Sequence, residues 1–169
     1  MYARQGVVGF DSLSNDSPLQ AEWRTYDGDP SLGLQCLAVR LYNGTGAATV
    51  KGRVYRVAFD GDEETNPSAL AVVTLASVYQ HVVVALEAVP TASWGWFAIQ
   101  GYVDAFVEGT TDVAKDDFLT CNDATDDDAF IDDTTARTVN SMAIACAAQA
   151  DNSAVLTRCF VFGDRAIIP

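Results

Sequence analysis

Basic residues are scarce in this chain. Its 169 residues include ten Lys and Arg but 23 Asp and Glu, which gives a formal net charge of −13 at pH 7. A protein that binds DNA or RNA needs a patch of Lys and Arg to displace counterions from the phosphates, and anionic lipid surfaces attract the same charges. The composition therefore excludes nucleic acid and anionic membranes as expected partners, and it favours solubility at high local concentration.

Long apolar runs are also missing. No stretch reaches the roughly 18 apolar residues of a membrane-spanning helix, and the N-terminus lacks a basic segment followed by an apolar one. The sequence predicts a soluble protein without an export signal. A hydrophobic fraction of 49% with only 20% charged residues predicts a folded chain, and the length is typical of one domain.

Cysteines are few and widely spaced, and no CxxC pair indicates a zinc or redox site. The four are Cys36, Cys121, Cys146 and Cys159. Buried free thiols are the favoured interpretation. Disulfides stay open, because spacing along the chain does not give the Cα separations that a disulfide requires.

Catalytic signatures are absent from the sequence. The single histidine, His81, begins an apolar strand, so any Ser/His/Asp or Cys/His arrangement would have to include it. A partly buried histidine at a strand edge is the favoured interpretation. No nucleophile elbow and no glycine-rich phosphate or dinucleotide loop occurs. We therefore expect no enzyme activity, no catalytic residue and no cofactor-binding residue.

Acidic residues are densest from Asp123 to Asp128, with Asp132 and Asp133 close behind. Their oxygen ligands suit Ca²⁺, but the spacing lacks the central glycine and terminal glutamate of an EF-hand loop. A solvated acidic loop that keeps sheet edges apart is favoured, and no metal ligand is predicted.

Aromatic residues offer one alternative binding site. Trp94, Trp96 and Tyr102 together suit an aromatic platform for sugars, although core and interface positions are the commoner role of such residues. Two N-glycosylation patterns, at Asn15 and Asn43, carry little weight without an export signal.

Short runs rich in β-branched and aromatic residues begin at Leu34 and predict an all-β fold, a compact antiparallel β-barrel or β-tulip. The predicted strands cover residues 34–42, 50–59, 69–77, 81–89, 96–109 and 154–163, with two short strands between 110 and 135. The alanine-rich stretch 136–150 suits a helix or a strand, and a strand in an antiparallel meander is favoured. Asn43 to Gly46 predicts a hairpin-like reversal. Gly101 predicts a bend or bulge that lets one long strand serve two parts of a curved sheet.

Residues 1–33 have a different composition, rich in Gly, Ser, Asp and Pro, with Phe10, Trp23 and Tyr26 in no periodic pattern. We predict an extended N-terminal arm over residues 1–33 and a β-barrel domain over residues 34–169. Apolar side chains on an arm suggest that it lies on a neighbouring subunit or a partner surface. The alternative is an arm wrapped over its own domain.

Two stretches of the chain carry a family resemblance through the order of their features. The first is Tyr42 to Gly46 followed by Val50-Lys51-Gly52, and the second is Trp94 to Ala105 followed by Val113 to Leu119. This order resembles small head-decoration and virion structural proteins of bacteriophages, over residues 34–163. Asp116 stands where that family has a turn glycine, so a different turn is expected there. The resemblance implies a β-barrel or β-tulip body, homotrimers or other homo-oligomers on an icosahedral shell, no enzyme activity and no cofactor.

Together these features predict a structural protein of the virion. We expect a capsid decoration (cement) protein that binds the major capsid protein on the outer capsid surface, associates with itself, and stabilises the shell through many copies of a modest interface. Two alternatives stay open. One is a tail, collar or head-fibre component with the same barrel, and the other is a carbohydrate-binding β module.

Overall fold

The computed structural model describes residues 21–25, 35–59, 70–73, 81–109, 112–121, 129–134, 141–150 and 153–162. Ten strands and no helix occur in these ranges, which confirms the predicted all-β fold. The strands are β1 (Ala21–Thr25), β2 (Gln35–Asn43), β3 (Val54–Phe59), β4 (Leu70–Val73), β5 (Val82–Ala85), β6 (Trp94–Glu108), β7 (Phe118–Cys121), β8 (Phe130–Thr134), β9 (Ala143–Ala145) and β10 (Val155–Val161).

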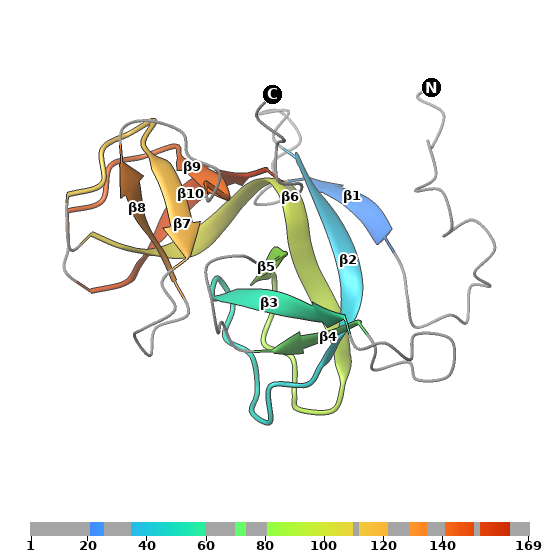
Figure 1. Ribbon diagram of the computed structural model, residues 1–169. Coiled ribbons are helices and arrows are strands. Elements are labelled where there is room, and N and C mark those ends of the chain that lie inside the picture. The colour runs from blue at the N-terminus through green and yellow to red at the C-terminus, as the bar shows by residue number, and fades with distance from the viewer. Residues whose placement is uncertain are drawn as a thin grey trace, which may run out of the picture.

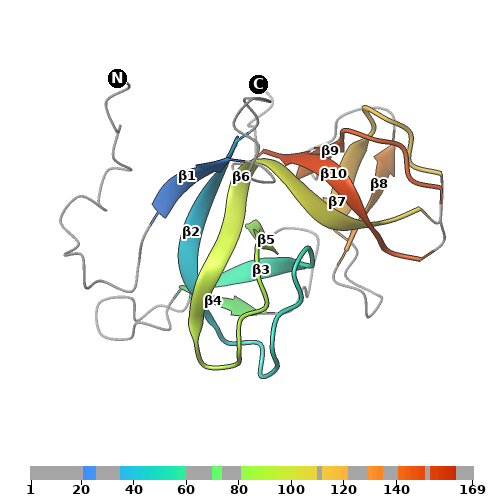
Figure 2. The ribbon, with the colours of Figure 1, turned by 180° about the vertical axis from the view of Figure 1, so that it is seen from behind.

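The strands form one sheet whose pairings close into two rings of five strands, so the predicted β-barrel is confirmed. The first ring runs β2, β4, β3, β5, β6 and closes through the β2–β6 pairing. The second ring runs β6, β10, β9, β7, β8 and closes through the β6–β8 pairing. Figure 1 shows the two rings side by side, with β6 passing from one into the other. Among the described strands β1 pairs with β2 alone, and it lies outside both rings (Figure 2).

Gly101 is the point where β6 passes from the first ring to the second. Its φ of 96° lies in the left-handed region, and it pairs with Cys36 of β2 and with Val161 of β10. A Cβ atom here would lie 2.3 Å from the carbonyl oxygen of Gln35, a backbone atom, so the position admits glycine only. The predicted bend in one long strand is therefore confirmed.

Each ring encloses an apolar core. The first core takes buried side chains from strands on opposite sides of its ring, which places them in the interior: Leu41, Tyr55, Val83, Ala85, Val89 and Phe97. The second core draws on all five strands of its ring: Val103, Ala105, Val107, Leu119, Cys121, Phe130, Ala143, Ala145, Cys159 and Val161. Four first-ring side chains join this second cluster: Cys36, Val54, Val84 and Ala98. The outer wall of the first ring thus packs against the second core, and burial of each large apolar side chain contributes roughly 1.5–3 kcal/mol to folding.

The two rings repeat one topology. In each ring the first strand pairs parallel with the third, β2 with β4 and β6 with β8, and the other pairings are antiparallel. Cross-strand partners correspond as well. Tyr42 pairs with Trp94 in the first ring as Phe106 pairs with Leu156 in the second. The second ring is therefore a structural repeat of the first, with β6 serving as the last strand of one ring and the first strand of the other.

Backbone hydrogen bonds outside the strands repeat in the same way. The Gly52 N–H donates to the Ala85 carbonyl, and the Asp116 N–H donates to the Ala145 carbonyl, both at 2.8 Å. Four further backbone hydrogen bonds of the first ring have an equivalent in the second. Written from donor N–H to acceptor carbonyl, with the second-ring equivalent in parentheses, they are Arg53 to Val50 (Asp117 to Ala114), Ala85 to Arg53 (Ala145 to Asp117), Leu86 to Trp96 (Cys146 to Arg158) and Thr49 to Val89 (Val113 to Gln149). Gly52 and Asp116 both have positive φ, 85° and 74°. The expectation of a different turn at Asp116 is therefore wrong, because Asp116 adopts the left-handed conformation itself.

The predicted hairpin-like reversal after β2 is also wrong. Strand β4 lies between β2 and β3, so the strands that flank the Asn43-to-Gly46 turn are not neighbours. Asn43 is fully buried at the end of β2, and its Nδ2 donates to the carbonyls of Ala47 and Val89. This side chain directs the following loop across the end of the first ring instead of back along β2.

β1 lies within the segment predicted to be an extended arm. It runs antiparallel to β2, with Trp23 opposite Leu37. Ala21–Thr25 therefore lies on its own domain, which is the alternative named for the arm. The rest of residues 1–33 lies outside the described ranges.

Candidate functional site

The most distinctive surface of the first ring is an aromatic face on β2 and β6. Trp94 and Trp96 point to one side of β6, because the intervening Gly95 and the following Phe97 are buried toward the first core. Tyr42 on β2 lies opposite Trp94, and the two rings meet edge to face with centroids 5.7 Å apart. Both side chains are half-buried and keep part of their surface in solvent.

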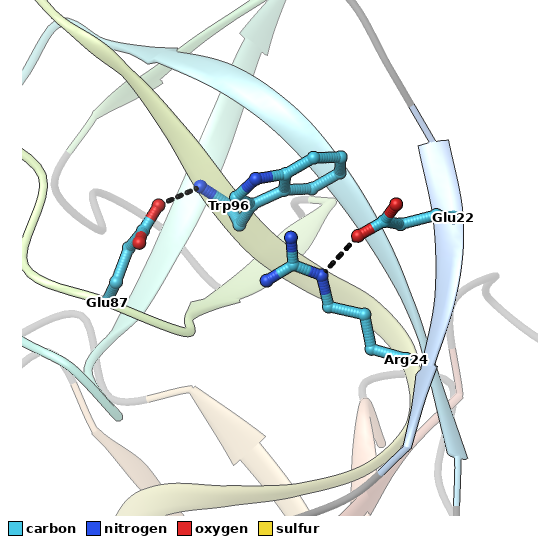
Figure 3. A network of polar contacts seen from close by, with 4 residues as sticks. All are labelled: Glu22, Arg24, Glu87 and Trp96. Atoms are coloured by element: carbon cyan, nitrogen blue, oxygen red, sulfur yellow. Dashed lines mark hydrogen bonds and ion pairs between the residues drawn. The ribbon is translucent and has the colours of Figure 1, made fainter. Parts of the chain in front are cut away.

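Arg24 of β1 covers Trp96. Its guanidinium lies 4.1 Å from the centroid of the Trp96 ring, and its Nε donates to Glu22 Oε1 at 2.6 Å. On the other side the Trp96 backbone N–H donates to Glu87 Oε1 at 3.0 Å, so Trp96 is held from both directions (Figure 3). The cation–π contact contributes about 0.5–2 kcal/mol and fastens β1 across β2 onto β6.

Tyr102, the third aromatic of the predicted sugar platform, lies elsewhere. It follows the Gly101 bend and belongs to the second ring, where it packs edge to face on Phe160 with centroids 4.9 Å apart. The structure thus brings Trp94 and Trp96 together but not Tyr102, and it places a guanidinium on Trp96. Tyr42 and Arg24 complete this face instead. Sequence reasoning missed both, although the pairing of Tyr42 with Trp94 follows once β2 and β6 are neighbours.

Trp23 is the most exposed large apolar side chain among the described residues, with 60% of its surface in solvent. It lies on β1, beside the Glu22 and Arg24 ion pair. Leu156 and Val155 on β10 and Val50 in the loop before β3 are the other exposed apolar side chains of the described ranges. Apolar surface of this kind is typical of contact surfaces when it gathers on one element.

His81 and the aspartates of the acidic stretch lie on different elements in the described part of the chain: His81 precedes β5, and Asp132 and Asp133 lie on β8. His81 is exposed before β5, where its carbonyl accepts a hydrogen bond from the Val57 N–H. Asp133 of β8 accepts a hydrogen bond from Ser141 Oγ at 2.6 Å, while Asp123 to Asp128 lie outside the described residues. No group of three or more His, Cys, Asp or Glu side chains within the described ranges is arranged to hold a metal ion.

All four cysteines are free thiols. Cys36, Cys121 and Cys159 are buried, and Cys146 is partly exposed. Burial raises the pKa of the Cys121 and Cys159 thiols far above their ordinary value of 9.0. These two groups are therefore neutral and unreactive in the folded protein, in agreement with the favoured interpretation of the sequence.

In the folded protein the Asn43 side chain is not accessible for N-glycosylation. The side chain has no exposed surface, and its Nδ2 atom, the one that would carry a glycan, donates to the carbonyls of Ala47, Val89 and Pro90. Its Oδ1 accepts from the backbone and hydroxyl of Thr45. Asn43 is a structural residue that organises the loop.

No protein-family model matches the chain, and no curated protein matches it. In the part of the chain that the structure describes, there is no helix long and apolar enough to cross a membrane.

Proposed function

We propose that this protein is a structural component of a bacteriophage-type virion, a capsid decoration protein that binds the outer surface of the shell. Its partners are the major capsid protein and further copies of itself, as a homotrimer or another homo-oligomer. In this proposal the chain carries out no catalysis and requires no cofactor. Its role is to add contact area between capsid subunits and so to stabilise the shell.

The double ring supports this proposal. The two rings share β6 and a common apolar junction, so their relative position is fixed by main-chain pairing and by core packing. A body of this kind loses little conformational freedom when it binds, and binding to a rigid shell then costs less ordering. The net charge of −13 also keeps crowded copies from associating without specificity.

The observation that carries the proposal is the exposure of Trp23. A tryptophan that keeps 60% of its surface in solvent, on a strand anchored by the Arg24 contact with Trp96, is a pre-positioned apolar anchor. Tryptophan and arginine are the residues that most often dominate binding energy at protein interfaces. β1 also lies at the edge of the sheet, where side chains and backbone are accessible to a partner.

The test is cosedimentation with capsids of the phage that encodes the chain. The intact protein is expected to saturate the particles at a fixed number of copies, and Trp23→Ser is expected to weaken binding by about tenfold or more. Val155→Ser is the matched control, because it also removes an exposed apolar side chain but lies on β10 of the second ring. Failure of the intact protein to bind capsids contradicts the proposal.

Trp94 supports a second candidate, a carbohydrate-binding module. Its ring lies on the outer face of β6 beside Tyr42, and edge-to-face aromatic pairs can border a sugar site. A glycan array distinguishes this candidate, because binding that is lost in Trp94→Ala and kept in Trp23→Ser favours the module over the virion protein. A tail, collar or head-fibre position predicts binding to virions but not to isolated capsids.

A further inference from the structure

The contact between the two rings contains a turn that docks on a pair of side chains. The turn is Val50 to Gly52 of the first ring, and the pair is Phe106 and Leu156 on the outer side of the second ring. The Phe106 N–H donates to the Gly52 carbonyl at 2.8 Å. A Cβ atom on Gly52 would lie 2.2 Å from Leu156 Cδ2 and 3.5 Å from Phe106 Cδ2, so the turn backbone already rests on both side chains.

The first ring has the same pair of positions, filled by Tyr42 and Trp94. The register of β2 against β6 places Tyr42 opposite Trp94 just as β6 against β10 places Phe106 opposite Leu156. In the second ring a turn of the ring that precedes it rests against this pair, although Leu156 keeps 48% of its surface in solvent. No ring precedes the first one in the described residues, and Tyr42 and Trp94 remain half-exposed.

The second ring in turn has a copy of the docking turn. Ala114, Lys115 and Asp116 correspond to Val50, Lys51 and Gly52, with the same hydrogen bonds and the same left-handed third residue. These three residues are exposed. No ring follows the second one in the described residues, so the turn has no counterpart surface within that part of the chain.

We infer that a second copy of this chain supplies the missing partner: the turn of residues 114–116 of one copy docks on the Tyr42 and Trp94 face of the next. The contact joins two different surfaces of the same protein, so it is head-to-tail and closes into a ring, such as a trimer, or extends as a filament. This contact would be the self-association included in the proposed function, and the inference rests on that part of the proposal.

Asp116 makes this contact weaker than the internal one. Gly52 has no side chain where it meets Leu156, whereas Asp116 brings a Cβ atom and a carboxylate to the centre of the docking turn. Replacement of Asp116 by glycine recreates the internal contact more closely. The inference thus predicts that Asp116→Gly tightens self-association. If Asp116 acted only within its own ring, its replacement would leave self-association unchanged.

The experiment is sedimentation velocity of the full-length protein over a concentration series without capsids. The intact protein is expected to associate, Trp94→Ser to weaken association by about tenfold, and Asp116→Gly to strengthen it several-fold. Ala114→Glu, which adds a charge to the exposed turn, is expected to abolish association. Val155→Ser is the control that leaves association unchanged, and thermal unfolding of each variant verifies that it is folded.

Mixing two variants tests the head-to-tail geometry. Trp94→Ser keeps the turn and Ala114→Glu keeps the face, so an equimolar mixture is expected to form heterodimers more tightly than either variant associates alone. A monomeric intact protein, an Asp116→Gly variant no tighter than the intact protein, or a mixture that stays monomeric overturns the inference. A monomer that still binds capsids overturns this inference alone, whereas self-association without capsid binding contradicts the proposed function alone.

Discussion

Gly52 and Asp116 occupy the same position in two turns that share their hydrogen bonds, at φ of 85° and 74°. An aspartate in the left-handed region is strained, whereas glycine is not. Asp116→Gly is therefore expected to raise the free energy of unfolding by about 1 kcal/mol. Gly52→Ala is expected to lower it by about 2 kcal/mol, because left-handed strain is joined by the contact with Leu156. Urea denaturation measures both, and a loss of stability in Asp116→Gly contradicts the assignment of strain.

Gly101 is expected to tolerate no side chain. Gly101→Ala places Cβ 2.3 Å from the Gln35 carbonyl oxygen and 2.9 Å from Cys36 Cα, so β2 and β6 must separate. We expect the free energy of unfolding to fall by about 3 kcal/mol or more, because the backbone clash adds to the left-handed strain. Gly46→Ala is the matched control: its φ is 83°, but its Cβ would meet nothing within 4 Å. Equal losses in the two variants, measured by thermal denaturation, would show that the close approach is unimportant.

Asn43 is expected to dominate the stability of the loop between β2 and β3. Asn43→Ala removes one of two donors to each of the carbonyls of Ala47 and Val89, which keep the Thr45 hydroxyl and the Thr49 N–H. Each lost hydrogen bond contributes about 0.5–1.5 kcal/mol, so a total of about 2 kcal/mol is expected. Thr45→Ala removes only a local contact and is expected to cost about 1 kcal/mol or less. Hydrogen exchange at the Thr45 amide, which donates to Asn43 Oδ1, is expected to become faster in Asn43→Ala.

The buried thiols predict a loss of stability in alkali. Burial raises the pKa of Cys121 and Cys159 above the ordinary 9.0, so above that pH the unfolded chain loses protons that the folded chain keeps. The contribution of these two thiols to the unfolding free energy is then constant below about pH 9 and falls at higher pH by up to about 1.4 kcal/mol per pH unit for each thiol. Urea denaturation between about pH 8 and pH 10.5 measures this slope. The doubly substituted Cys121→Ala, Cys159→Ala protein is expected to show a smaller slope; an unchanged slope assigns the effect to other groups.

The strand pattern was readable from the sequence because alternation and turn residues are local signals. Gly101 was correctly predicted to be a bend, since a glycine in a long alternating strand has few other roles. The sequence pattern did not predict which strands pair with one another. The Asn43 turn predicted a hairpin because such turns usually join paired strands, but here β4 is inserted between β2 and β3.

The repeat of the two rings was hidden for a different reason. Lys51 and Lys115 are among the few equivalent positions that keep the same residue, whereas Phe97 is replaced by Cys159 and Asn43 by Val107. Both replacements keep a buried side chain and change its volume and polarity, so burial is conserved without identity. Only part of the aromatic face could be predicted. Trp94 and Trp96 share a face because they are two residues apart on one strand, but Arg24 contacts Trp96 only because β1 pairs with β2.

The shared strand β6 has a mechanical consequence. Force applied to either ring is transmitted through β6 to the other, because no hinge or linker separates them at Gly101. The two ladders share Gly101, so separation of β2 from β6 is expected to loosen the start of the β6–β10 pairing as well. Resistance to stretching is therefore expected to depend on Gly101, the residue that both ladders share.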